Sequence, residues 1–154
     1  AGDFIAGVVG QNIVLEGMAF SVFEMMEAGS RDLNPKFAHT LSGTIADERR
    51  HVGFGENRIG SLIREHPEKK EEIEKMQEQM TFYMLAAFAD SFKQLPPPSS
   101  IPEVQNIDIE WHGVNLAKAS SDEMESLLAN TVIGEYKTRL NRIGLEYRQP
   151  KTSV

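Results

Sequence analysis

A long apolar segment with one carboxylate near its middle most constrains how this chain can fold. Between Asp3 and Glu27 the apolar residues recur with the period of an α-helix, and Glu16 falls on the same side as several of them. No Lys or Arg lies within four residues of Glu16 in either direction. Because an unpartnered carboxylate is costly inside a helical core, the pattern predicts that Glu16 is protonated, paired or bound to a metal.

A short turn separates this segment from a second predicted helix. Gly29 suits the end of the first helix, Asn34 suits an N-cap, and Pro35 suits the first position of the next helix. The second helix is expected to run from Pro35 to Glu65 with an apolar inner stripe. Because the connection is short, the two helices should pack as antiparallel neighbours.

Glu48 and His51 fall on the inner stripe of this second helix. They are three residues apart, so they point from one side of the helix about one turn apart. Glu16 and Glu48 both lie about sixteen residues from the turn, which is roughly 24 Å at the helical rise per residue. The three side chains are therefore expected to meet, where they can bind a metal ion. The alternative is a buried Glu–His or Glu–Arg pair without a metal.

The rest of the chain is also expected to be helical, which makes the predicted fold all-α. A third helix is predicted over Pro67–Lys93, and a Pro-rich connector follows at residues 95–102. Residues 107–119 are expected to hold a short helix or turn, and Ser120 with Glu123 forms a capping box for a last helix. We expect one helical domain over residues 1–154, made of a metal-binding helix pair (1–66), a third helix (67–95), and a connector with the C-terminal helix (96–154).

Composition narrows the functional classes. The formal net charge of -7 argues against a general affinity for nucleic acid or for an anionic membrane, so neither is expected as a partner. The chain contains no cysteine, which excludes disulfides, thiolate metal sites and cysteine nucleophiles. A cysteine-free composition fits a cytoplasmic protein, and this is the expected location.

The arrangement resembles one half of the metal site in ferritin-like di-iron carboxylate proteins. In those proteins two helices each contribute a Glu and two others each contribute a Glu-x-x-His. Here Glu16 is followed some thirty residues later by Asp47-Glu48-Arg49-Arg50-His51. The resemblance covers about residues 4–63. The Asp-Glu-x-x-His form with Arg50 is similar to the branch that contains ribonucleotide reductase small subunits, their oxidase relatives and bacterial multicomponent monooxygenases.

This resemblance implies a ferritin-like helical bundle, of which the chain supplies the C-terminal half plus additional helices. It also implies a site for two iron ions or a manganese–iron pair. Glu16 and Glu48 would bind or bridge the metals, and His51 would ligate one of them through a ring nitrogen. Asp47 would hydrogen-bond a His of the other half-site, and Arg50 would pair with an acidic residue, because such outer contacts orient the ligands.

A substrate pocket is expected beside these ligands. The residues that would line it are Phe20, Phe23, Thr44 and Gly55. Phe20 lies one turn after Glu16, where the monooxygenases have a threonine and where the reductase subunits have an aromatic residue in an apolar pocket. The aromatic residue therefore favours the reductase-like branch.

The chain departs from the family pattern because a second Glu and a second Glu-x-x-His are missing. His66 precedes Pro67, and His112 has no Glu three residues before it. An N-terminal helix pair, another polypeptide or the mate in a symmetric homodimer could each supply the missing half. A homo-oligomer is therefore expected.

Three functions remain open from the sequence. The leading one is an oxygen-activating di-iron or manganese–iron oxidoreductase, because carboxylate-rich sites with few nitrogen ligands suit hard, redox-active cations. The second is an iron-oxidising or iron-handling ferritin-like protein without an organic substrate. The third is a non-catalytic helical assembly subunit in which Glu16, Glu48 and His51 form a polar cluster without a metal.

Overall fold

The N-terminal apolar segment forms one long helix with a change of pitch near its middle. The computed structural model describes residues 2–94, 96, 100–104 and 106–150. In it, α1 (Gly2–Val8) passes into a π-helical turn, η1 (Val9–Leu15), which passes directly into α2 (Glu16–Ser30). The expectation that Gly29 ends this helix was wrong. Arg31 keeps a helical backbone, and its guanidinium donates to the Glu27 carboxylate at 2.6 Å, which extends the last turn.

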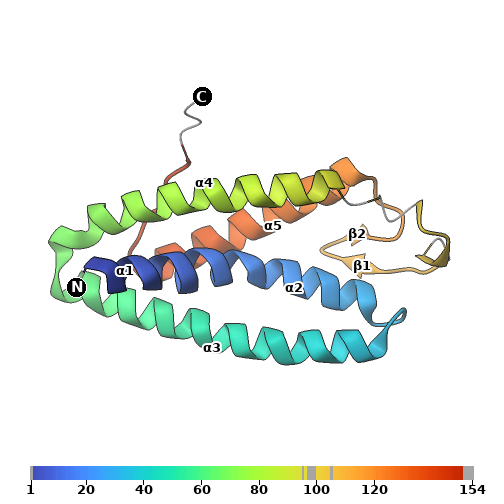
Figure 1. The fold of residues 1–154 in the computed structure, drawn as a ribbon, viewed down its shortest axis with the longest axis horizontal. Helices are drawn as coiled ribbons and strands as arrows, with labels where there is room; N and C mark the ends of the chain where they lie inside the picture. Colours follow the sequence, from blue (N-terminus) through green and yellow to red (C-terminus); the bar gives the residue numbers. More distant parts are fainter. Residues whose placement is uncertain (1, 95, 97–99, 105, 151–154) are drawn as a thin grey trace.

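The second predicted helix is confirmed, with both of its expected ends. α3 spans Pro35–Glu65 and begins at Asn34, whose side-chain oxygen accepts a hydrogen bond from the Phe37 N–H at 3.1 Å. Pro35 occupies the first helical turn, where its missing N–H costs nothing. α2 and α3 run antiparallel side by side along the length of the molecule (Figure 1).

Two further helices complete the bundle. α4 (Lys70–Gln94) follows a short 3-10 turn, η2 (Pro67–Lys69), so the regular helix begins three residues later than predicted. A second short 3-10 turn, η4, covers Pro102–Val104. α5 (Ser121–Arg142) begins with the predicted capping box, in which Ser120 and Glu123 exchange hydrogen bonds between side chain and backbone. The described residues are mostly helical, as an all-α fold requires.

A small hairpin replaces the helix or turn expected over residues 107–119. β1 (Glu110–Trp111) pairs antiparallel with β2 (Val114–Asn115), with Trp111 opposite Val114. His112 and Gly113 form the two-residue connection and both have positive φ angles, 47° and 78°, as tight hairpins require. The buried Trp111 side chain anchors the hairpin to the core.

The long α1–α2 helix is the centre of the molecule. α3 packs along one side of it, α4 packs against η1, and α5 packs against α2 (Figure 1). The core continues across α5, where Tyr136 is fully buried and its hydroxyl donates to Gln77 Oε1 at 3.2 Å. Burial raises the pKa of Tyr136, so its hydroxyl stays protonated and remains a donor.

The segment Phe4–Ser30 is long and apolar enough to cross a membrane by length and composition alone. Core helices of bundles pass the same test, and half of the most apolar part of this segment is buried against the other helices. Glu16 lies in the middle of the segment, where a membrane span would place it at the most apolar depth. The fold therefore uses this segment as a bundle helix.

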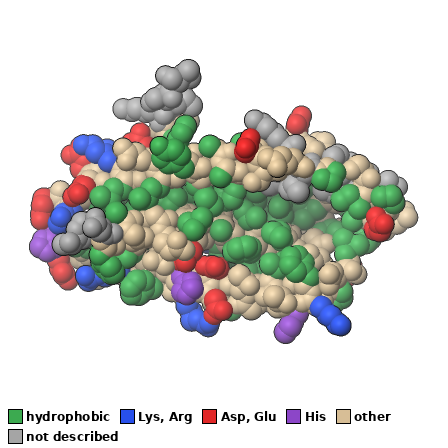
Figure 2. All heavy atoms as spheres, viewed as in Figure 1, with side chains coloured by type: hydrophobic (Ala, Val, Ile, Leu, Met, Phe, Trp, Pro, Cys, Tyr) green, Lys and Arg blue, Asp and Glu red, His purple; other side chains and the backbone are tan. Residues whose placement is uncertain are grey.

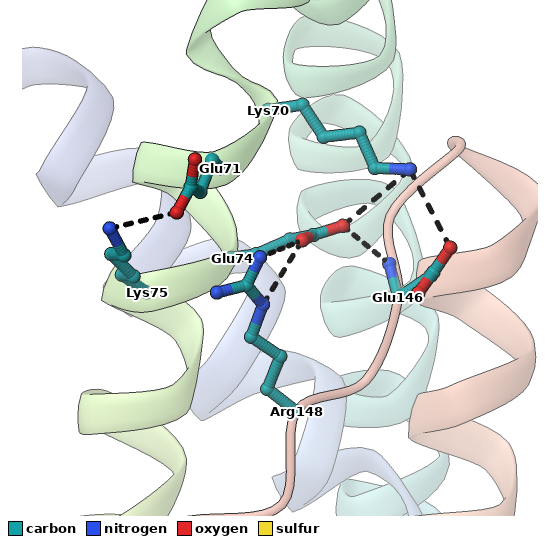
Figure 3. Close-up of polar contacts among 6 residues, drawn as sticks. All are labelled: Lys70, Glu71, Glu74, Lys75, Glu146 and Arg148. Atoms are coloured by element: carbon teal, nitrogen blue, oxygen red, sulfur yellow. Dashed lines mark hydrogen bonds and ion pairs between the residues drawn. The ribbon is translucent and has the colours of Figure 1, made fainter.

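The C-terminal residues return along the bundle and are held to α4 by a buried carboxylate. Glu74 accepts a hydrogen bond from the backbone N–H of Glu146 at 3.0 Å and two from the guanidinium of Arg148, at 2.7 and 3.1 Å (Figure 3). Lys70 lies 3.6 Å from the same carboxylate. Leu145, beside this anchor, is fully buried. The strap after α5 therefore closes the end of the bundle at which α4 begins.

Candidate metal centre

The π-helical turn directs two amide side chains onto Glu16. Gln11 Nε2 donates to Glu16 Oε1 at 3.0 Å, and Asn12 Nδ2 donates to Glu16 Oε2 at 2.7 Å. A π-turn contains more residues than an α-turn, so the residues four and five positions earlier both lie over the same side chain. Each carboxylate oxygen of Glu16 thus has one donor from its own helix. These two hydrogen bonds fix the carboxylate in place. Glu16 itself is buried, with 8% of its surface exposed.

Glu48 and His51 of α3 approach this carboxylate from the neighbouring helix. His51 Nδ1 lies 3.4 Å from Glu16 Oε1 and 3.6 Å from Glu48 Oε2. Both distances exceed the range of about 2.7–3.2 Å that is usual for N–H···O hydrogen bonds. Glu48 Oε2 is buried and has no hydrogen-bond partner in the structure. A buried carboxylate oxygen without a donor is unfavourable, so this atom calls for a cation or a donor that is not part of the described chain.

The three side chains can hold one ion between them. One ligand atom from each of Glu16, Glu48 and His51 lies within 4.8 Å of the others. Oxygen and nitrogen ligands stand about 2.0–2.2 Å from a divalent metal, which places two ligands of one ion about 3–4.4 Å apart. The observed spacing needs only small side-chain rotations to reach that range. Among the residues that the structure describes, Glu16, Glu48 and His51 form the one set of three acidic or His side chains with such spacing.

The site is open on one side. The Glu16 and Glu48 side chains are 10% and 20% exposed, whereas the His51 side chain is 56% exposed. Two carboxylates therefore form a buried floor and the imidazole stands at the rim. On the side of the site where His51 stands, the site is exposed to solvent.

Asp47 and Arg50 lie beside the site but contact each other. Their side chains form an ion pair within α3, one turn apart, and both are exposed. Arg50 thus pairs with an acidic residue beside the site, as expected, and that residue is Asp47. The hydrogen bond expected from Asp47 to a His of the other half-site stays a prediction. The pair leaves both side chains on the surface next to His51.

The four residues expected to form a substrate pocket are divided between different surroundings. Phe20 is buried between two guanidinium groups, with Arg139 4.7 Å and Arg49 5.5 Å from its ring centre. Phe23 is half-buried on α2. The Thr44 hydroxyl donates to the Thr40 carbonyl oxygen at 3.3 Å, within its own helix. Gly55 is packed against the π-turn.

Phe20 lines two adjoining cavities at the junction of α2, α3 and α5. One has a volume of about 420 Å³ and is lined by α3 and α5 residues, and the other, of about 470 Å³, is lined mainly by α5. Arg139 lines both. Its guanidinium donates to the Gly17 carbonyl oxygen at 2.6 Å, and burial lowers its pKa although Glu135, Glu56 and Glu24 act in the opposite sense. The charged side chains of Arg139 and Arg142 line both cavities beside the Phe20 ring.

Gln11 and Asn12 are the site residues that the sequence reasoning missed. Their amide side chains precede Glu16 by five and four positions, and this spacing was the available signal. The other two histidines considered lie elsewhere. His66 Nδ1 is 3.2 Å from Glu68, and the His112 ring stacks edge-on against Trp111.

No protein-family model, curated protein or solved structure matches this chain. Three features of the site bear on its function. They are two carboxylates and one imidazole within reach of a single ion, two amides that fix one carboxylate, and one buried carboxylate oxygen without a donor.

Proposed function

We propose that this chain supplies half of a ferritin-like bundle and binds iron, or manganese and iron, in an oxygen-activating oxidoreductase. The convergence of Glu16, Glu48 and His51 on one ion-sized space carries the proposal. In the ferritin-like arrangement, a Glu and a Glu-x-x-His on neighbouring helices form half of a two-metal site. This chain presents that half.

The donor set fits these metals. Carboxylate oxygens and imidazole nitrogens suit manganese and iron, and the site contains no thiolate that would favour softer cations. The buried Glu48 Oε2 without a donor gains the partner it lacks when a cation is bound. Each Glu16 oxygen accepts one amide hydrogen bond and keeps a lone pair for a metal.

Each residue of the chain has a distinct task in this proposal. Glu16 and Glu48 would hold the ions, and His51 would ligate through Nδ1, the ring nitrogen that lies nearest to both carboxylates. Gln11 and Asn12 keep the Glu16 carboxylate oriented toward α3. When bound, the metal pair would supply the oxygen-activating redox chemistry, and the protein would place it.

Metal binding by the purified chain tests the proposal. Anaerobic titration with Fe²⁺, and separately with Mn²⁺, followed by elemental analysis, should give a saturable site in the wild type. Glu48→Gln and His51→Ala should each reduce the bound metal by at least tenfold. Glu125→Gln, at an exposed position of α5, is the matched control and should bind as the wild type does. A wild-type chain that binds neither metal would remove the proposal, and oxygen consumption by the Fe²⁺-loaded protein tests the redox step.

A polar cluster without a metal is the second candidate, and one observation favours it. Glu16 already has two amide donors and a His51 nitrogen at 3.4 Å, so it has partners without any ion. In that case Glu48→Ala would leave the metal content of the wild type and the variant equally at background. The variant would differ in its free energy of unfolding only.

A further inference from the structure

An uncovered apolar stripe runs along the same side of the molecule as the candidate metal centre. On α1–α2 it consists of Leu15 and Met26, which are exposed, with Ala19 and Val22 partly buried between them. Spacings of four, three and four residues place these side chains on one side of the helix. Other sides of the same helix contact α3, α4 and α5. An apolar side of a helix ordinarily packs against another element, yet among the described residues no element covers Leu15 and Met26.

Two exposed side chains of α3 border this apolar stripe. His51 opens toward solvent, and Phe54, one turn later on the same side, is 55% exposed. Figure 2 shows hydrophobic side chains along this side of the molecule, over α1–α2, with acidic and His side chains next to them toward α3. We call the surface formed by Leu15, Ala19, Val22, Met26, His51 and Phe54 the open face.

The exposed area of the chain is larger than a compact monomer of its mass needs. The accessible surface is 9127 Å², whereas a folded monomer of 17.2 kDa has about 7,800 Å². The excess of roughly 1,300 Å² exceeds the ~800 Å² that each partner buries in an interface of standard size. The exposed side chains of Leu15, Met26 and Phe54 place part of this exposed surface on the open face.

We propose that the open face binds the open face of a second copy of this chain, so that the two copies together complete a two-metal site. This inference rests on the proposed metal-binding function. A two-fold axis through the site would bring together two copies each of Glu16, Glu48 and His51. That set is two Glu and two Glu-x-x-His on four helices, which is the complete pattern for a two-metal carboxylate site. An isologous two-fold dimer is also the commonest form of assembly.

Charge makes this association dependent on metal. Four carboxylates, from Glu16 and Glu48 of each copy, lie beside His51 just behind the two open faces, and they repel one another when an apolar interface removes water from them. Two divalent cations balance those four charges. The apolar stripe therefore supplies the contact area and the cations remove the repulsion, so the dimer should form when metal is bound and weaken when it is removed.

A lipid bilayer is a poorer occupant of the same face. The stripe on α1–α2 continues past Glu16, and the adjoining rim on α3 carries Asp47 and His51. Hydrocarbon would remove water from these groups and offer no counter-charge in return. A protein partner that shares metal ions provides that counter-charge.

The test is the mass of the 154-residue chain in solution, measured by light scattering and analytical ultracentrifugation. The chain is studied with a chelator, with Mn²⁺ and, under anaerobic conditions, with Fe²⁺. We expect a dimer with two metal ions per dimer in the presence of either cation. Removal of the metal should raise the dissociation constant of the dimer at least tenfold. Glu48→Gln should lose both the metal and the dimer.

Two substitutions on the open face separate the interface from the ligands. Leu15→Asp and Met26→Asp leave all three ligands in place and should make the metal-loaded chain monomeric. Leu33→Asp is the matched control, because Leu33 is 42% exposed like Leu15 but lies in the turn between α2 and α3. The control should dimerise like the wild type, and circular dichroism of each variant verifies that it is folded.

Three results would overturn the inference, each in a distinguishable way. A chain that binds metal and stays monomeric removes the dimer but keeps the proposed function. A dimer that holds no metal and does not respond to chelator or to Glu48→Gln removes the shared site and the proposed function together. A monomer that floats with phosphatidylcholine vesicles, and loses this behaviour in Leu15→Asp, shows that the open face binds lipid.

Discussion

Gly55 of α3 lies directly against Asn12 of the π-turn. A Cβ atom added to Gly55 would lie 2.6 Å from the Asn12 Cβ and 3.2 Å from the Ile13 Cδ1. The first distance is too short for two carbon atoms, so any side chain at Gly55 would push the π-turn away from α3. Since Asn12 donates to Glu16 at 2.7 Å, this close approach also sets the position of the candidate ligand.

Gly55→Ala is therefore expected to destabilise the protein and to weaken metal binding together. Overpacking of this kind costs about 1–3 kcal/mol. Gly53→Ala is the control on the same helix, because an added Cβ there meets nothing within 4 Å. It should raise the free energy of unfolding by about 0.5–1 kcal/mol, since Ala is favoured over Gly in helices. Urea unfolding of both variants measures the two effects, and equal results for both would contradict the packing argument.

The two amides that fix Glu16 should affect metal affinity more than stability. Asn12→Ala and Gln11→Ala each remove one hydrogen bond to the carboxylate, and the loss of such outer contacts costs about 10–100-fold in metal affinity. Asn57→Ala, at an exposed position of α3, should leave the affinity unchanged. Calorimetric titration with Mn²⁺ measures all three. Unchanged affinity in both amide variants would show that the Glu16 carboxylate is oriented by α3 alone.

The buried Glu74 carboxylate should be the main anchor of the C-terminal strap. Glu74→Ala removes the partner of Arg148 and of the Glu146 N–H together, and leaves a half-buried guanidinium without its carboxylate (Figure 3). Hydrogen bonds to charged groups contribute about 1.5–3 kcal/mol, so a loss of about 2–3 kcal/mol is expected in urea unfolding. Residues 144–150 should also become the first site of limited proteolysis.

Glu71 provides the comparison for this prediction. It lies one turn from Lys75, at 2.9 Å, and both side chains are on the surface of α4. Glu71→Ala should change neither stability nor proteolysis measurably, because exposed ion pairs contribute little. A comparable loss in both variants would mean that the strap is not held by Glu74 and that α4 itself is sensitive to any change in its first turns.

Stability should depend on pH through Glu24. Burial, and then the nearby Glu135, raise the pKa of the Glu24 carboxyl above its ordinary value of 4.5. The folded state thus holds this proton more tightly than the unfolded chain. The contribution of Glu24 is therefore most favourable below pH 4.5 and is lost as the pH rises through the raised pKa.

Glu24→Gln removes this dependence and tests it. Relative to the wild type, the variant should gain stability at pH 7, and the gain should shrink as the pH falls toward 4. Thermal unfolding at a series of pH values measures the difference, with Glu125→Gln as the exposed control. A difference that stays constant with pH would assign the effect to packing of the amide and not to the ionisation of Glu24.

Local sequence signals predicted the helix starts well and the irregular elements poorly. Asn34, Pro35 and the Ser120–Glu123 capping box have direct chemical causes, and the structure confirms them. The π-turn was not predicted because residues 4–10 and 13–15 are all apolar or glycine, so they offer no sharp stripe whose phase could reveal an extra residue. The hairpin was not predicted from the sequence, because each strand has only two residues and its turn is His-Gly instead of the usual Asn-Gly.

The convergence of Glu16 with Glu48 was open to prediction because both lie equally far from a short turn. The exposure of His51 could not be predicted. Helical spacing shows which residues share a side of a helix, but it does not show whether another element covers that side. Phe23 and Thr44 illustrate the same limit. A shared stripe placed them near the ligands, but only coordinates show that Thr44 donates within its own helix.

The change of pitch at η1 has a further consequence for how this helix tolerates alteration. It sets the rotational phase between the residues before Val9 and those after Leu15. A π-turn holds one residue more than the α-turn it replaces. If η1 became ordinary α-helix at unchanged length, everything upstream would turn by about 100° around the axis, and Val8 would leave the interior with no residue lost. Deleting one residue within η1 would instead give a regular helix that keeps the phase of the residues before it, so this stretch should tolerate a one-residue deletion better than a regular part of the helix does.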